Sequence, residues 1–152
     1  MRRSDLEIID IQEIEDVISE AKFCRLAMVD QGAPYIVPMC FGYEDGRLYF
    51  HSAAAGRKLD AIRRNGLVSF EITAEAEVLL SPGADGGGVR YRSVIGTGAA
   101  RILEDPSEKE HALQVLARHY FGRGIEIPPD AARRAVAIEV RIDSMTGKRS
   151  GG

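Results

Sequence analysis

Several residue types are scarce in this chain, and their scarcity narrows the class of protein. None of the 152 residues is tryptophan, aromatic residues make up 7%, and two are cysteine. Cys24 and Cys40 form neither a CxxC pair nor a zinc-ligand spacing, which argues against a disulfide framework and a zinc site. Both lie in apolar, strand-like segments, so we expect buried, reduced thiols.

Long apolar runs and an excess of basic charge are also lacking. No stretch approaches the roughly 18 apolar residues of a membrane span. The start, MRRSDLEII, lacks the apolar region of a signal peptide, so we expect a cytoplasmic protein without a membrane partner. The formal net charge of −3 argues against a nucleic-acid partner, because such proteins carry a basic surface that neutralises phosphates. One local phosphate pocket remains compatible with this charge.

The chain contains many short strand patterns and few helical ones. Alternation of apolar and polar residues predicts strands over 23–30, 34–43, 47–53, 67–73, 90–103 and 133–143. Helical spacing predicts helices over 10–22, 56–65 and 106–120. Residues 74–89 fit neither pattern, and the SPGADGGG run at 81–88 predicts a loop. The length and this order predict one domain, residues 1–152, of the mainly β class, with an antiparallel barrel and peripheral helices.

Individual residues indicate where these predicted helices and strands begin, bend or lie at the edge of the sheet. Asp10 is placed to cap the first helix, and Glu13 completes a capping box. Pro38 lies inside the second strand and cannot donate a ladder hydrogen bond, so that strand is not expected to be fully paired on both sides. Gly96 and Gly98 predict a bend or bulge in the long strand.

The segment HSAAAGRK, residues 51–58, is the most informative part of the chain. A strand ends there and a helix begins with two adjacent cations, although each cation in the first turn of a helix costs roughly 0.3–1 kcal/mol. The arrangement is best explained by a bound anion such as phosphate. Ser52 offers a hydroxyl donor, Arg57 a planar fork, Lys58 a point charge, and Gly56 allows close backbone approach.

Other cations and histidines allow two interpretations each. Arg57 and Lys58 also fit a solvated helix face, and His51 also fits a plain strand end. Arg90 and Arg92 share one strand face, where they can meet a flavin or a substrate anion, or form surface or inter-subunit ion pairs.

The late-helix histidines do not predict a metal site. His111 and His119 lie roughly two turns apart, whereas helical metal pairs prefer the i,i+4 spacing. No third ligand is close to them in the sequence.

At these residues the chain resembles the pyridoxamine 5′-phosphate oxidase-like, FMN-binding split-barrel superfamily, and within it the 5-nitroimidazole-resistance (Nim-type) group. The resemblance implies a six-stranded antiparallel split β-barrel and a homodimer with FMN at the subunit interface. The segments that carry it follow in order: CRLAMVDQGAPYIVPMCFGYEDGRLYFHSA (24–53), GRKLDAIRRN (56–65), LVSFEI (67–72) and RYRSVIGTGAARIL (90–103).

The resemblance also implies roles for particular residues. Ser52, Arg57 and Lys58 correspond to the family's phosphate ligands, with Gly56 beside them, and His51 lies close to the cofactor as the candidate catalytic residue. Arg92 is expected to reach the site from the partner subunit. The flavin ring is expected to lie along the second strand, at Val37, Pro38, Met39, Cys40 and Phe41.

The chain departs from the pyridoxamine phosphate oxidases proper in two places. It has an aromatic residue at Phe41 where they carry a basic one nearby, and it ends TGKRSGG without their arginine-rich, substrate-binding segment. Oxidation of vitamin B6 is therefore not expected.

The resulting prediction is a flavoprotein that passes electrons from FMN to a small-molecule acceptor such as a nitroaromatic. The alternatives are a non-catalytic FMN carrier or sensor, the same barrel holding haem or a deazaflavin, and an interaction protein with a degenerate pocket. A haem would need an axial ligand such as His51 or one of the late-helix histidines.

Overall fold

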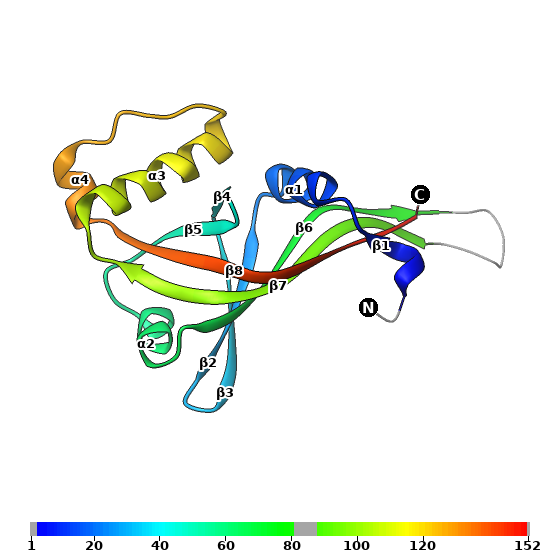
Figure 1. Ribbon diagram of the computed structural model, residues 1–152, viewed down its shortest axis with the longest axis horizontal. Helices are drawn as coiled ribbons and strands as arrows, with labels where there is room; N and C mark the ends of the chain where they lie inside the picture. Colours follow the sequence, from blue (N-terminus) through cyan, green and yellow to red (C-terminus); the bar gives the residue numbers. More distant parts are fainter. Residues whose placement is uncertain (1–2, 81–87, 152) are drawn as a thin grey trace.

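A computed structural model describes residues 3–80 and 88–151 and shows a mainly β protein (Figure 1). The loop predicted at 81–88 lies outside the described residues except for Gly88, which begins a strand. Among the described residues, no helix combines the length and apolar character needed to cross a membrane.

The described strands form one antiparallel sheet, and most match the sequence predictions. They are β1 (Glu7–Ile8), β2 (Cys24–Asp30), β3 (Ala33–Met39), β4 (Gly42–Glu44), β5 (Arg47–Ser52), β6 (Leu67–Leu79), β7 (Gly88–Leu103) and β8 (Val136–Ser150). The helices are the short 3₁₀ turn η1 (Ser4–Leu6), α1 (Ile11–Glu20), α2 (Arg57–Arg64), α3 (Pro106–Phe121) and α4 (Pro129–Arg134).

The two edge strands of the sheet are joined by the chain instead of by backbone hydrogen bonds, which makes the sheet a split barrel. Its order is β3-β2-β6-β7-β8-β5-β4, so the two edge strands, β3 and β4, are consecutive in the sequence. Cys40 and Phe41 connect them across the split. The single strand predicted at 34–43 is therefore wrong, because its halves pair with different neighbours, β3 with β2 and β4 with β5.

The predicted class is confirmed, but the strand count differs from six. The strands β3 and β4 are separate, and β1 is an additional short strand that pairs with β8. β3 pairs with β2 alone at the edge of the sheet, which accommodates Pro38.

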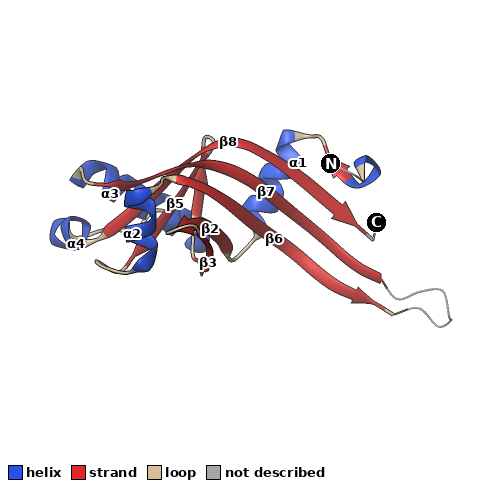
Figure 2. Ribbon diagram, turned by 90° about the horizontal axis from the view of Figure 1, so that it is seen from below, coloured by secondary structure: helices blue, strands red, loops and turns tan. Residues whose placement is uncertain are grey.

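The last three long strands extend past the barrel (Figure 2). β6 and β8 run beyond the predicted ends at 73 and 143, because exposed extensions held by backbone pairing with β7 need no alternation of apolar residues. The helices α2, α3 and α4 gather at the opposite end of the molecule from these extensions (Figure 2). The predicted irregularity in β7 is confirmed as a register shift between Thr97 and Gly98.

Helix α1 begins where the sequence predicts. The Asp10 side chain accepts a hydrogen bond from the Gln12 backbone N–H at 2.9 Å, which confirms the N-cap. The Glu13 carboxylate, expected to return to the cap, instead accepts from Arg149 on β8 at 2.6 Å. This contact ties the first helix to the last strand.

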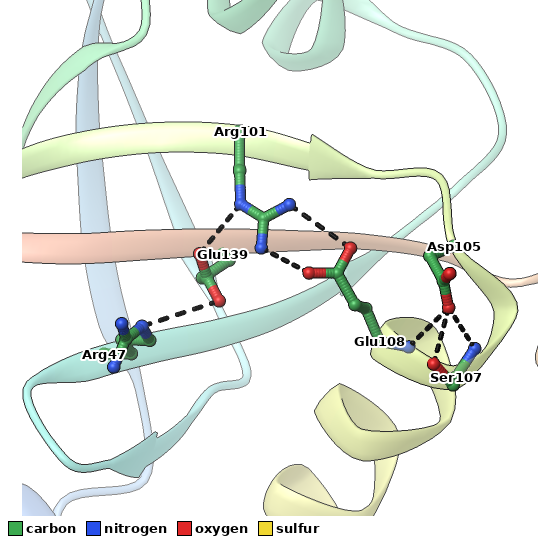
Figure 3. A network of polar contacts seen from close by, with 6 residues as sticks. All are labelled: Arg47, Arg101, Asp105, Ser107, Glu108 and Glu139. Carbon is green, nitrogen blue, oxygen red and sulfur yellow. Dashed lines mark hydrogen bonds and ion pairs between the residues drawn. The ribbon is translucent and has the colours of Figure 1, made fainter.

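A polar network fixes the start of α3 against the sheet (Figure 3). Arg101 of β7 donates to Glu139 of β8 at 2.9 Å and to both carboxylate oxygens of Glu108 in α3, at 2.6 and 3.2 Å. Asp105 caps the helix by accepting from the backbone N–H groups of Ser107 and Glu108. The arginine holds the pKa of Glu108 below its usual range by hydrogen bonding.

Replacing Gly96 by alanine tests how closely the barrel wall packs. A Cβ there would meet the Phe70 ring and lie 2.6 Å from the Ser144 carbonyl oxygen. We expect the free energy of unfolding, measured by urea denaturation, to fall by about 1–3 kcal/mol. Gly88→Ala is the control in the same strand, because its Cβ would meet no atom within 4 Å. Equal denaturation midpoints for the two variants would contradict this packing.

Candidate functional site

Two cavities lie at the split between β3 and β4 and share part of their walls. The first, the polar cavity, has a volume of about 470 Å³. The second, the apolar cavity, has a volume of about 450 Å³. Cys40 and His51 line both, so the two spaces adjoin at these side chains.

The polar cavity gathers residues from three parts of the chain. They come from the end of β3 and the break after it, from the end of β5, and from the first turn of α2. Most of the predicted site residues are among them. The lining residues are Pro38, Met39, Cys40, His51, Ser52, Ala53 and Lys58.

The start of α2 presents backbone donors near this cavity. Its N-cap residue is Gly56, whose φ of 141° strongly favours glycine. Among the described residues, no side chain caps this helix end. The first helical hydrogen bonds run from Leu59 and Asp60 to the Gly56 carbonyl, so the N–H groups of Arg57 and Lys58 have no partner within the helix.

Arg57 has a partner that local sequence reasoning missed. Its Nε lies 2.6 Å from Oδ2 of Asp30, a carboxylate that is 8% exposed and also pairs with Arg64 at 2.8 Å. Its guanidinium lies 4.2 Å from the centre of the Tyr35 ring. For Arg57, the anion that the helix-start charges indicated is therefore at least in part a protein carboxylate. Asp30 ends β2, far away in the sequence, where it looks like an ordinary turn residue.

Lys58 is the cation that faces the polar cavity. Its side chain is half-buried, and it takes part in none of the ion pairs formed within residues 3–80 and 88–151. Ser52 lies beside it, with its hydroxyl donating to the neighbouring Ala53 carbonyl at 3.0 Å. A half-buried ammonium group without a carboxylate partner favours a bound anion.

Two predicted contact residues of the second strand point into the protein. Phe41 is fully buried, and its ring lies 4.5 Å from the His119 ring. Val37 is half-buried and packs against the core. The Phe41 side chain is therefore closed to a ligand beside this strand, and the expected placement of a flavin along residues 37–41 stays a prediction.

Arg92 lies in the β6–β7 extension, away from the residues that line the polar cavity. Its guanidinium pairs with Glu20 of α1 at 2.5 Å and with Glu75 of β6 at 3.4 Å. Within one protomer it thus forms the surface ion pairs that were the alternative interpretation. Hydrogen bonding to Glu20 raises its pKa above the usual value.

The two cysteines differ in environment. Cys24 is buried, and burial raises the pKa of its thiol to about 12. Cys40 is exposed, contrary to the prediction, because it lies at the break between the strands and not inside one. Its side chain lines both cavities.

Helix α3 holds the break in place. The Tyr120 hydroxyl donates to the Lys22 carbonyl at 2.7 Å and accepts from the Phe41 N–H at 3.1 Å. Burial raises the pKa of Tyr120 to about 12. Next to it, the His119 ring nitrogen Nε2 lies 2.8 Å from the Ala21 carbonyl oxygen. No local pattern in the sequence indicates these hydrogen bonds of Tyr120.

The apolar cavity lies between α3, the following segment and α4. Its walls are mainly aliphatic and aromatic, and no sequence pattern indicated it. The lining residues are Cys40, His51, Leu113, Leu116, Ala117, Tyr120, Phe121, Ile125, Glu126, Ile127, Pro128 and Ala131.

The family assignment agrees with this architecture. The family model described as pyridoxamine 5′-phosphate oxidase matches residues 10–149. The chain belongs to this family. The match spans the split barrel, both cavities and α3.

Relatives of known structure share the fold. A proposed 5-nitroimidazole antibiotic resistance protein from Bacteroides thetaiotaomicron is 34% identical, with a TM-score of 0.85 over 95% of this chain and 86% of that one. An FAD-binding protein from Mesorhizobium loti is 25% identical, with a TM-score of 0.68 over 94% of this chain and 96% of that one. An uncharacterised protein of Rhizobium meliloti is 28% identical over 94% of both chains.

His119 predicts a pH dependence of stability. Burial lowers its pKa, so below about pH 6.5 the unfolded chain takes up a proton that the folded protein does not. This contribution to stability is complete above pH 6.5 and is lost as the pH falls toward the folded-state pKa. We expect the melting temperature to fall less between pH 7.5 and 5.5 in His119→Gln than in the wild type. Equal slopes in the two proteins would contradict this assignment.

Proposed function

We propose that the protein binds FMN in the polar cavity and acts as a flavin-dependent reductase of small molecules. The observation that carries the proposal is Lys58, a half-buried ammonium group without a carboxylate partner in the described chain, lining a cavity beside unpaired helix N–H groups. This combination suits a phosphate group, since helix N-termini and ammonium groups both stabilise anions.

The other residues of the cavity fit the rest of the cofactor. Ser52 has a hydroxyl that can turn from the Ala53 carbonyl to a phosphate oxygen. Arg57 pairs with Asp30 through Nε, so its terminal nitrogens stay available, and its side chain is 54% exposed. Pro38 and Met39 offer apolar surface to a ring system. The volume of about 470 Å³ lies within the usual range for a small-molecule pocket.

The relatives support a flavin. The Mesorhizobium loti protein is described as FAD-binding, and the Bacteroides protein as a proposed resistance factor against 5-nitroimidazoles. We extend both descriptions to this chain as a proposal: FMN as the flavin, and nitroaromatic compounds among the electron acceptors.

The bound flavin would supply the electron transfer, and the protein would bind, orient and shield it. His51 is the candidate catalytic residue, because it is exposed where the two cavities adjoin. Its imidazole can donate an N–H hydrogen bond to an acceptor bound there. Ser52 and Lys58 would hold the phosphate end.

We further propose that two copies form a homodimer through the outer face of the barrel and share the flavin sites. In the pairing register, four exposed apolar side chains of β2, β3, β6 and β7 lie on that face. Large apolar patches on a protein surface mark interaction sites. The residues and their exposed fractions are Val29 (45%), Ile36 (60%), Leu67 (62%) and Ile95 (57%).

Flavin binding is tested first by the absorbance spectrum after addition of FMN and desalting. We expect retained flavin bands in the wild type, and an FMN affinity about 10- to 100-fold lower in Lys58→Ala, because a charged contact to phosphate is lost. Arg63→Ala is the control, since Arg63 lies on the same helix, exposed, and contacts Asp60 at 3.4 Å.

The possible outcomes separate the cofactor from the site. Flavin that binds equally well to Lys58→Ala would place the phosphate elsewhere. A wild-type protein that retains no flavin would overturn the proposal that the cofactor is FMN. A Soret band would indicate that it binds haem instead. Turnover with a reduced nicotinamide and a nitroaromatic distinguishes a reductase from an FMN carrier or sensor.

The homodimer is tested by sedimentation velocity. We expect a dimer for the wild type and a monomer for Ile95→Glu, because a charge buried at an apolar interface is costly. Ile11→Glu is the control, since Ile11 is 55% exposed but lies on α1. A monomeric wild type would refute the proposed dimer.

A further inference from the structure

We propose that the apolar cavity is the binding site of the second substrate and selects uncharged, largely apolar ring molecules. This inference deepens the proposed function, because the role of the ligand as electron acceptor rests on that function. Binding by itself requires only the cavity.

The lining chemistry determines the ligand class. The walls are mainly Leu, Ile, Ala, Pro, Phe and Tyr side chains, and Glu126 is the one carboxylate among the described lining residues, which include no lysine or arginine. An anionic ligand would lose its hydration here without gaining a cation. An uncharged ring would gain from burial against the aliphatic walls. A phosphorylated substrate is thus disfavoured, in contrast to the polar cavity with its lysine.

The position of the cavity connects it to the proposed flavin site. Cys40 and His51 line both spaces, so ligands in the two cavities would contact the same two side chains. The His51 ring can donate an N–H to a carbonyl or nitro oxygen at this junction. The volume of about 450 Å³ suits one or two fused rings with small substituents.

One wall is a segment held by the side chain of a single residue. The Gln114 amide donates to the Ile125 carbonyl at 2.6 Å and accepts from the Ile125 N–H at 3.1 Å. These two hydrogen bonds hold the backbone of Ile125, the first lining residue of the segment 125–128, against α3. Gln114 is therefore a positioning residue for the cavity and is not itself among the lining residues.

The test uses the neutral fluorescent probe N-phenyl-1-naphthylamine, titrated into the protein with and without FMN. Leu113→Trp fills the cavity and is expected to lower probe affinity by about tenfold or more through steric exclusion. Glu110→Trp is the matched control, since it adds the same side chain one turn earlier, at an exposed position outside the lining. We expect 1,4-naphthoquinone to displace the probe from the wild type.

The charge preference is measured with a matched pair of competitors. We expect 1-naphthalenesulfonate, which carries a negative charge on the same ring system, to compete at least about tenfold more weakly than 1,4-naphthoquinone. Equal competition by the two would overturn the proposed ligand class. Equal probe affinity in Leu113→Trp and the wild type would overturn the proposed site.

A second variant keeps the proposal testable if Leu113→Trp does not fold. Gln114→Ala removes both hydrogen bonds to Ile125 and is expected to weaken probe binding several-fold, with faster hydrogen exchange at the Ile125 amide. Unchanged binding together with faster exchange would refute the role of this wall. Displacement of the probe by haemin, with a shifted Soret band, would reassign the cavity to haem.

The outcomes distinguish this inference from the proposed function. Probe binding that is lost in Leu113→Trp while FMN affinity stays at the wild-type level supports two separate sites. Probe binding in a protein that holds no flavin would leave the apolar site standing and overturn the flavin proposal. A protein that binds FMN but no probe would overturn the inference alone.

Discussion

The Tyr120 hydroxyl sits at the point on which the barrel and both cavities depend. The chain leaves β3 at Met39 and must cross to the other edge of the sheet, and the Phe41 N–H would have no strand partner there. The Tyr120 hydroxyl accepts that hydrogen bond and donates its own to the Lys22 carbonyl. One partly buried side chain thus satisfies a backbone group at the break and anchors α3 across the split.

The two cavities follow from this single break. The strand edges separate where Cys40 leaves the sheet, and its side chain faces both spaces, with His51 from β5 opposite. On one side, α2 supplies a lysine and N–H groups that have no partner within the helix, which favour an anion. On the other, α3 and the segment fastened by Gln114 supply aliphatic walls, which favour an uncharged ring.

Arg57 and Lys58 show how far a local electrostatic argument reaches. Two cations at the start of a helix predicted an anion, and an anion is present for one of them, the Asp30 carboxylate of β2. Lys58 has no such partner in the described chain and remains half-buried in the polar cavity. Sequence reasoning identified the charge imbalance correctly, but it had no means to see a carboxylate that only the barrel brings beside α2.

The sequence by itself determined the class of fold and most of the helices and strands. It also pointed to residues 51–58 as a segment with an unusual charge at a helix start. Alternation, capping and helix-end charges are local properties, so the sequence alone shows them. It also identified the family through the order of its segments. Tertiary structure alone decided which side chains meet. The predicted strand 34–43 is two strands because its halves pair with different neighbours, and Phe41 lies in the core. Arg92 pairs with Glu20. The apolar cavity is formed by α3 and by residues that carry no local signal. These outcomes depend on contacts between distant parts of the chain, which no local pattern encodes.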